Sequence, residues 1–338
     1  MPRLTTGRAT TIAVLLAAVA LGAALRLIPW WRGADRELLS DTAFHLRMAR
    51  SVSQGWRMPV VDSLASAPIG REVERWLPTG LYWAAGSFHL AAAAIDRRGL
   101  ETHVRWFVAL AGALIALPVY GAARALGWRR AAALVAALVA VTLPAHLHRS
   151  FGYWFRYDPL GTLLIATHVA FSLAALAATT RRSARAASVG AALALVASLA
   201  VWRVALMLPV LEIAFLLLYG LFRPPGRALR EWWSVQVAGG TLASLGLVYL
   251  RDQSFALSTA WLLAMGLAVA LWTPWLKRED APPARRAAVL ALVALAALWG
   301  ARLAGLATPY AEVLDAAVRK LGGALGATFV TAPTTSIP

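Results

Sequence analysis

Long apolar runs recur from one end of this chain to the other, and they limit the fold more than any other feature. The first run, ATTIAVLLAAVALGAALRLI, occupies residues 9–28 and contains a single charged side chain. An apolar run of about 18 or more residues can cross the hydrocarbon core of a bilayer as one α-helix. This run is too long and too thinly flanked by basic residues for a typical cleaved signal, so we expect a retained anchor helix.

The composition is that of a membrane protein. Of the 338 residues, 60% are hydrophobic and 14% are charged, and the mean hydropathy is +0.64. Soluble domains carry about 25% charged residues. We therefore predict an all-α, polytopic helical membrane protein with about nine transmembrane helices and a long first external loop. The spans are expected near residues 9–29, 105–126, 131–148, 159–179, 186–202, 204–222, 233–250, 254–276 and 286–306.

Basic residues are divided unevenly between the short loops. The N-terminus and one set of loops hold 15 Arg and Lys residues, against 4 in the alternate short loops. Cytoplasmic loops carry an excess of Lys and Arg, so we place the N-terminus in the cytoplasm and residues 30–104 and 149–158 outside. The short apolar run at 79–95 is assigned to the first external loop. The net charge of +17 is thus mostly topological, and nucleic acid is not an expected partner.

Two outward-facing segments carry acidic residues close to the membrane. Asp41 lies in LLSDTAFHLRMA, about a dozen residues after the first span, and Asp158 lies in HRSFGYWFRYDPLGTLL at the start of the fourth. Carboxylates at one face, with His45 nearby, suit a hard divalent cation such as Mg²⁺ or Mn²⁺. Such a cation would hold a diphosphate and neutralise it as a leaving group. The chain has no cysteine, which excludes thiolate metal sites and disulfides.

These acids also have structural interpretations, which the sequence leaves open. Asp41 is equally suited to cap a helix that starts at the next residue. His45, four residues further on, would then be a surface contact. Asp158 is equally suited to cap the fourth span or to pair with Arg149 or Arg156. The aromatic residues that precede it fit an interfacial belt as well as a binding wall.

Glu212 differs from these acids because it lies inside an apolar span, LPVLEIAFLLLYG. Intramembrane charges are costly, which makes this carboxylate a functional candidate. The structural alternative is a pairing with Arg203. For His168, inside another span, we expect a hydrogen bond between helices.

The first external segment resembles the catalytic subunits of oligosaccharyltransferases, in the type C glycosyltransferase class. The resemblance is carried by SDTAFHLRMARSVSQGWRMPVVDSLASAPIG and covers roughly the first 220 residues. HRSFGYWFRYDPLGTLL is similar to the second loop of that family, and VWRVALMLP is also similar. The matching positions in the first segment are Asp41, Phe44, His45, Leu46, Arg47, Gly55, Pro59, Asp62, Pro68 and Gly70.

The resemblance implies roles for individual residues. Asp41 would bind the divalent metal and contact the acceptor, and Asp158 would correspond to the second acid of an Asp-x-Asp motif. The first acid of that motif is replaced here by Arg156, which removes a metal ligand and adds a positive charge. That guanidinium would instead suit the donor diphosphate. His45, Arg47 and Arg203 are further candidate diphosphate contacts.

The same resemblance implies that the chain is the N-terminal membrane part of a longer protein. The family supplies a catalytic Glu from a later external loop, and neither Glu312 nor Asp315 has the expected setting. A C-terminal domain with a Trp-Trp-Asp-Tyr-Gly motif is absent from the sequence. We therefore expect a transmembrane domain over residues 1–307, followed at 308–338 by the start of a later external loop.

The function that follows is a membrane glycosyltransferase of the oligosaccharyltransferase kind. It would move a glycan from a polyprenyl-diphosphate donor to a protein or peptide acceptor, at an Asn side chain, at the outer face of a prokaryotic inner or plasma membrane. One alternative is a type C glycosyltransferase that uses a lipid, hydroxyl or cell-wall acceptor. Another is an inactive lipid-binding or transporter-like helical bundle.

Overall fold

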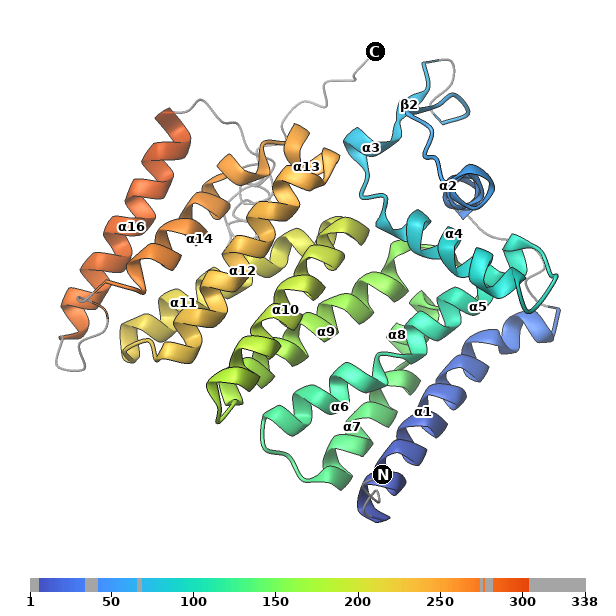
Figure 1. Cartoon of the computed structure of the whole chain (residues 1–338), viewed down its shortest axis with the longest axis horizontal. Coiled ribbons are helices and arrows are strands. Elements are labelled where there is room, and N and C mark those ends of the chain that lie inside the picture. The colour runs from blue at the N-terminus through green and yellow to red at the C-terminus, as the bar shows by residue number, and fades with distance from the viewer. Residues whose placement is uncertain (1–5, 34–41, 66–68, 274–275, 277–281, 304–338) are drawn as a thin grey trace, which may run out of the picture.

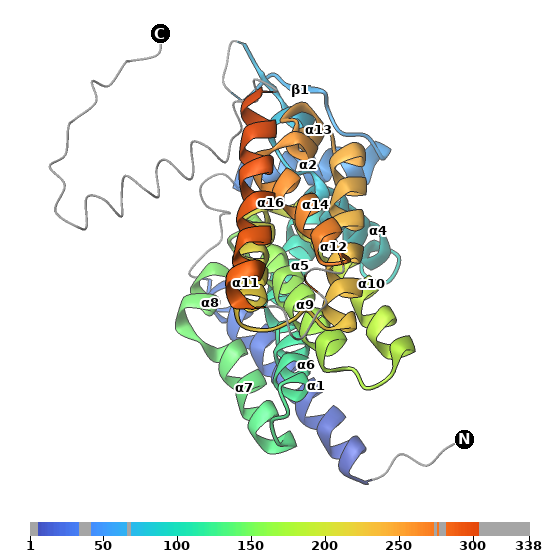
Figure 2. The same cartoon turned by 90° about the vertical axis from the view of Figure 1, so that its left-hand side faces the viewer.

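The protein is a bundle of α-helices with one two-stranded sheet among the residues described here. The computed structural model describes residues 6–33, 42–65, 69–273, 276 and 282–303. Helices dominate these residues, as predicted, because apolar runs without water must satisfy their backbone hydrogen bonds internally. In the views of Figures 1 and 2, the bundle helices run between two ends of the molecule.

Each expected span corresponds to one helix or to two consecutive helices. Five of these passages are long and apolar enough to cross a membrane by themselves, namely Gly7–Trp31, Leu100–Ala125, Tyr157–Ala177, Arg181–Val201 and Arg203–Phe222. The helices are α1 (Thr6–Trp31), α5 (Leu100–Ala113), α6 (Ala116–Ala125), α7 (Arg130–Thr142), α8 (Pro144–Arg149), α9 (Tyr157–Ala177), α10 (Arg181–Val201), α11 (Met207–Phe222), α12 (Arg227–Gly246), α13 (Val248–Asp252), α14 (Thr259–Ala270) and α16 (Pro283–Leu303). Short 3₁₀ helices, η1 (Arg203–Leu206) and η2 (Phe255–Leu257), precede α11 and α14.

Proline residues explain two places where an expected single span is broken. Pro118 lacks an N–H group, and its ring crowds the carbonyl of Leu114. Leu114 lies in the break between α5, which ends at Ala113, and α6, which begins at Ala116. Pro144 starts α8 and forces Leu143 into an extended conformation, with φ −58° and ψ 121°. The expected span 131–148 is therefore the α7–α8 pair.

The first external segment is folded. It consists of α2 (Thr42–Gly55), β1 (Val61–Asp62), β2 (Arg71–Glu72), α3 (Val73–Trp76) and α4 (Gly80–Ala93). The two strands are antiparallel, with Val61 opposite Glu72 and Asp62 opposite Arg71. The run at 79–95 forms α4, which packs on α2 and α5 and is not among the candidate spans of the described chain. The predicted loop is also shorter than expected, because α5 already begins at Leu100.

The two groups of loops that the charge pattern separates lie at opposite ends of the bundle. In Figure 1, the turns between α6 and α7, α9 and α10, and α11 and α12 lie along the lower edge, with the N-terminal end of α1. The elements α2, α3, α4 and α13 lie along the upper edge. An ion pair of 3.8 Å between Arg75 and Asp252 joins the first external segment to α13.

A buried arginine fastens α1 to the helices around it. The side chain of Arg26 is fully buried, and its guanidinium donates to Gly22 O at 2.8 Å, Val141 O at 3.0 Å and Ser150 Oγ at 2.8 Å. Gly112 on α5 lies beside this guanidinium, where an added Cβ would be 2.5 Å from Nε. An intramembrane charge is tolerated where the bundle interior supplies such acceptors.

Candidate functional site

Three segments that are distant in the sequence meet at the end of the bundle that was predicted to face outward. Their contact is a hydrogen-bonded chain of His45 on α2, Tyr82 on α4 and Tyr157 on α9. The Nδ1 atom of His45 lies 3.0 Å from the Tyr82 hydroxyl, which lies 2.5 Å from the Tyr157 hydroxyl. His45 is 3% exposed and Tyr82 is fully buried. These two hydrogen bonds therefore fix the first turns of α2, α4 and α9 relative to one another.

The loop before α9 is held in place by aromatic packing against His45. Phe155 is fully buried, and its ring meets the His45 ring edge-on at a centroid distance of 6.2 Å. Arg156 then takes an extended conformation as the N-cap of α9, with φ −140° and ψ 173°. This turn of the chain positions Tyr157 and Asp158 in the first turn of the helix. Asp158 is therefore not the cap of the fourth span.

Arg47 and Asp62 close the first external segment. Arg47 Nη2 donates to Asp62 Oδ2 at 2.6 Å, and Asp62 Oδ1 also accepts from the backbone N–H of Leu64 at 3.2 Å. Asp62 is 7% exposed, whereas Arg47 is only partly buried. The pair ties α2 to β1, so Arg47 has a structural partner besides any ligand.

A cavity of about 400 Å³ opens beside the hydrogen-bonded chain. Its lining includes His45, Arg47, Arg71 and Tyr157, together with apolar side chains from α2 and from the segment around β1 and β2. Two guanidinium groups and an imidazole give the cavity the donors that an anionic group requires. The lining is therefore compatible with a phosphate or diphosphate group.

Asp158 lies between two arginines. Arg149 Nη1 is 3.9 Å from Asp158 Oδ1, and Arg156 Nε is 4.0 Å from Asp158 Oδ2. Both separations exceed hydrogen-bonding distance, so the arginines act through charge and leave the carboxylate lone pairs for another partner. Both guanidinium groups also lie over the Trp154 ring, at 5.9 Å and 5.2 Å from its centroid. The alternative pairing of Asp158 with Arg149 or Arg156 is thus present in the structure.

Several predicted site residues lie outside the described part of the chain. They are Asp41, Pro68, Glu312 and Asp315, with the whole of residues 308–338. Asp41 directly precedes Thr42, the first residue of α2. Among the described residues, no group of three or more His, Asp or Glu side chains could hold a metal ion.

The remaining candidates have separate positions. Arg203 is exposed at the start of η1, and it does not line the cavity formed by described residues. Glu212 pairs with His168 instead of with Arg203: His168 Nε2 lies 2.6 Å from Glu212 Oε1, and His168 Nδ1 lies 2.8 Å from Ala191 O. The expected inter-helix hydrogen bond of His168 is confirmed, and the suggested pairing of Glu212 with Arg203 is wrong.

Two residues of this site were not identified from the sequence. Tyr82 sits in an apolar run, where a single tyrosine carries no periodic signal. Arg71 follows the Pro-x-Gly of the first external segment. The pairing of β1 with β2 places Arg71 in the lining of the same cavity as His45, and the sequence gives no signal of that pairing. Fold and site together define a polytopic helical membrane protein with a cavity lined by arginine and histidine side chains at one end.

Comparison with solved structures narrows this class. The chain is similar to the crystal structure of the Archaeoglobus fulgidus oligosaccharyltransferase in the apo form, with a TM-score of 0.73, 18% identity and 96% of this chain covered. A second structure of that protein, tethered by a disulfide bond to an acceptor peptide containing the NVT sequon, gives a TM-score of 0.58, 17% identity and 94% coverage.

The chain spans 40% and 39% of the chain in those two structures and matches the N-terminal part of that protein. No family model matches the sequence, and no curated protein does. At this level of identity the similarity shows the fold, which is that of an oligosaccharyltransferase membrane domain. The described chain therefore has the fold of the N-terminal membrane part of that protein.

Proposed function

We propose that this chain is the donor-binding membrane part of a glycosyltransferase that uses a polyprenyl-diphosphate-linked glycan. The observation that carries the proposal is the cavity of about 400 Å³ with Arg47, Arg71 and His45 in its lining, in a chain with an oligosaccharyltransferase fold. A diphosphate needs several donors at one place, and a pair of guanidinium groups supplies them in a geometry that fits phosphate oxygens.

The reaction we propose is displacement at the anomeric carbon of the glycan. The bond from that carbon to the diphosphate oxygen breaks, a bond to the acceptor nitrogen forms, and the acceptor loses a proton. Arg47 and Arg71 would stabilise the negative charge that develops on the leaving diphosphate. The tethered peptide in the similar crystal structure supports a peptide acceptor with an Asn side chain.

We further propose that Asp41 and Asp158 hold a divalent cation, Mg²⁺ or Mn²⁺, which would neutralise the leaving group. The first turns of α2 and α9 are adjacent, because the His45 and Tyr157 rings are 4.8 Å apart between centroids. Asp158 lies in one of these turns, and Asp41 directly precedes the other. The open lone pairs of Asp158 are compatible with a metal ligand.

The proposed location follows from the charge pattern. The cavity lies at the end opposite the turns rich in arginine, so it would face outward from a prokaryotic inner or plasma membrane. Arginine in place of the first acid next to Asp158 favours a second function, a related glycosyltransferase with a hydroxyl or lipid acceptor. Both functions share the same donor, and acceptors tested in membranes separate them.

A donor-binding measurement tests the proposal on the natural full-length protein in nanodiscs. A polyprenyl-diphosphate-linked disaccharide with a fluorescent label on the sugar serves as the probe. We expect Arg71→Ala to weaken binding at least tenfold. Arg98→Ala, which removes an equal charge from the turn between α4 and α5, should leave binding unchanged. Equal affinities for wild-type protein and Arg71→Ala would overturn the assignment of the cavity.

A further inference from the structure

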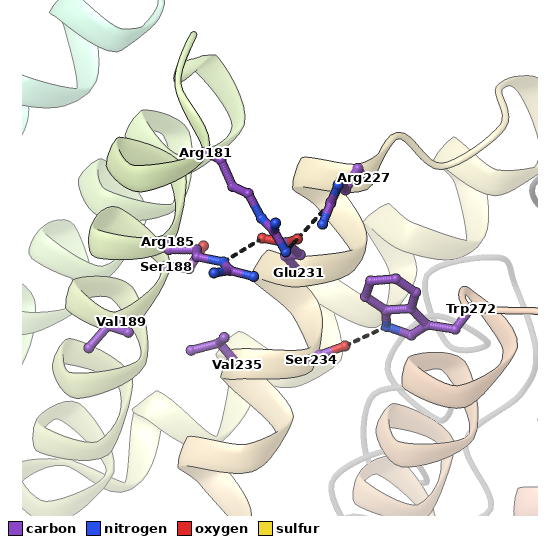
Figure 3. A pocket seen from close by; sticks show the side chains of 9 residues that line it. All are labelled: Arg181, Arg185, Ser188, Val189, Arg227, Glu231, Ser234, Val235 and Trp272. Atoms are coloured by element: carbon purple, nitrogen blue, oxygen red, sulfur yellow. Dashed lines mark hydrogen bonds and ion pairs between the residues drawn. The ribbon is translucent and has the colours of Figure 1, made fainter.

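A groove with apolar walls and charged side chains lies at the opposite end of the bundle, between the first turns of α10 and α12. Its volume is about 570 Å³, and its lining includes Arg181, Arg185, Arg227, Glu231 and Trp272. Figure 3 shows the arginine side chains extending from the two helices toward Glu231. The described residues that line the groove are all different from those that line the cavity beside His45.

The mouth of this groove carries an excess of positive charge. Among the described residues of its lining, Glu231 is the only acid, and it meets Arg227 at 2.8 Å, Arg185 at 3.2 Å and Arg181 at 3.4 Å. The hydrogen bond from Arg227 holds the pKa of Glu231 below its usual value, so the carboxylate is charged at neutral pH. Each guanidinium has five N–H donors, so the three arginines together have more donors than the one carboxylate of Glu231 can accept. The surplus can receive an anion.

The walls below the charges are apolar. Val189 on α10 and Val235 on α12 line the groove one to two turns inward from the arginines, and Trp272 closes its far side. The indole Nε1 of Trp272 donates to Ser234 Oγ at 2.9 Å, and Arg230 lies over the indole ring at 5.1 Å. Tryptophan with this mixed polar and apolar setting is typical of the membrane–water interface.

The position of the groove agrees with a lipid ligand. It opens beside the turn between α9 and α10, at the edge of the bundle where the arginine-rich turns gather in Figure 1. The charge pattern assigns this edge to the cytoplasmic side, where anionic lipids attract basic side chains. A soluble anion would use the arginines alone, whereas a phospholipid would use both the charges and the apolar walls.

We propose that this groove binds one anionic phospholipid of the cytoplasmic leaflet. The phosphate of the headgroup lies against Arg181, Arg185 and Arg227, and an acyl chain lies along Val189 and Val235. The lipid phosphate takes over part of the donors that Glu231 engages in the structure. The lipid thereby joins α10 to α12.

Native mass spectrometry of the protein in neutral detergent tests this proposal. Phosphatidylglycerol is added at a series of concentrations, with phosphatidylcholine as the uncharged comparison. We expect one phosphatidylglycerol to be retained, and the triple variant Arg181→Ala, Arg185→Ala, Arg227→Ala to bind it at least tenfold more weakly. The matched control replaces Arg124, Arg129 and Arg130 by alanine, which removes the same charge from another turn at the same edge, and should leave the binding constant unchanged.

Glu231→Gln keeps the size of the side chain and removes the charge that competes with the lipid phosphate. This variant tests the proposal if the triple variant does not fold. It should bind phosphatidylglycerol more tightly than wild-type protein. Equal losses in the triple variant and its control, or equal retention of both lipids, would overturn the proposal. Displacement of the lipid by millimolar inorganic phosphate would also overturn it, in favour of a soluble anion site.

Discussion

The imidazole of His168 on α9 and the carboxylate of Glu212 on α11 are joined inside the bundle, with 2.6 Å between Nε2 and Oε1. His168 also faces a carbonyl acceptor, Ala191 O, through its other nitrogen. Both ring nitrogens therefore face oxygen acceptors, which requires either a doubly protonated His168 or a protonated Glu212. His168 therefore links three helices, because it lies on α9, Glu212 lies on α11 and Ala191 lies on α10.

Breaking this pair should destabilise the bundle. His168→Ala leaves Ala191 O and Glu212 without their partner, at a cost of about 1–3 kcal/mol in the free energy of unfolding. Glu212→Gln should cost less, because its amide can donate to the neutral imidazole. Thermal unfolding in detergent measures both. If Glu212→Gln proved the more damaging change, the pair would not be the structural bond described here.

The hydroxyl of Tyr82 should matter more to stability than that of Tyr157. Tyr82 lies between His45 and Tyr157, so Tyr82→Phe removes both hydrogen bonds that link these three side chains, whereas Tyr157→Phe removes one of the two. We expect losses of about 1–3 kcal/mol for the first variant and a smaller loss for the second. Unfolding midpoints in detergent give the order, and Tyr120→Phe on α6, away from this chain, serves as the control. The reverse order would contradict the geometry.

The contact between α12 and α14 has no room for a methyl group at Gly240. A Cβ there would fall on the Trp261 ring, which is almost fully buried, so Gly240→Ala should cost about 1–3 kcal/mol. Gly246 on the same helix has open space around it, and Gly246→Ala should change the stability by less than about 1 kcal/mol. Parallel thermal unfolding of the two variants measures the difference. Equal midpoints would show that α12 and α14 are less closely packed.

Metal binding should depend on both proposed acids. Mn²⁺ titration followed by electron paramagnetic resonance, without any substrate, should show at least tenfold weaker binding for Asp41→Ala and for Asp158→Ala. Asp96→Asn, in the exposed turn before α5, is the control. Arg156→Asp removes a positive charge 4.0 Å from Asp158 and supplies a carboxylate, so it should tighten binding. If Asp41→Ala, Asp158→Ala and Arg156→Asp all bound Mn²⁺ as tightly as the wild-type protein, the two acids would not be metal ligands.

Much of the architecture was predictable from local sequence, because the length and polarity of a run decide whether it can cross a bilayer. The apolar runs located the helices, and the arginine-rich turns separated the two ends. The internal breaks at Pro118 and Pro144 were missed, since both prolines lie inside otherwise continuous apolar runs. Arg26 was visible in the first run, but its acceptors come from segments more than 100 positions away, except for Gly22.

The sequence by itself determined that this is a polytopic helical membrane protein, because apolar runs near 20 residues in length have no other stable state in a bilayer. It also identified His45, Arg47 and Asp158 as polar residues at one face. Only the tertiary structure decided their partners. Hydrogen bonds and ion pairs such as His45 with Tyr82, or Glu231 with Arg181, depend on helix packing across long sequence separations. Side-chain periodicity does not encode that packing.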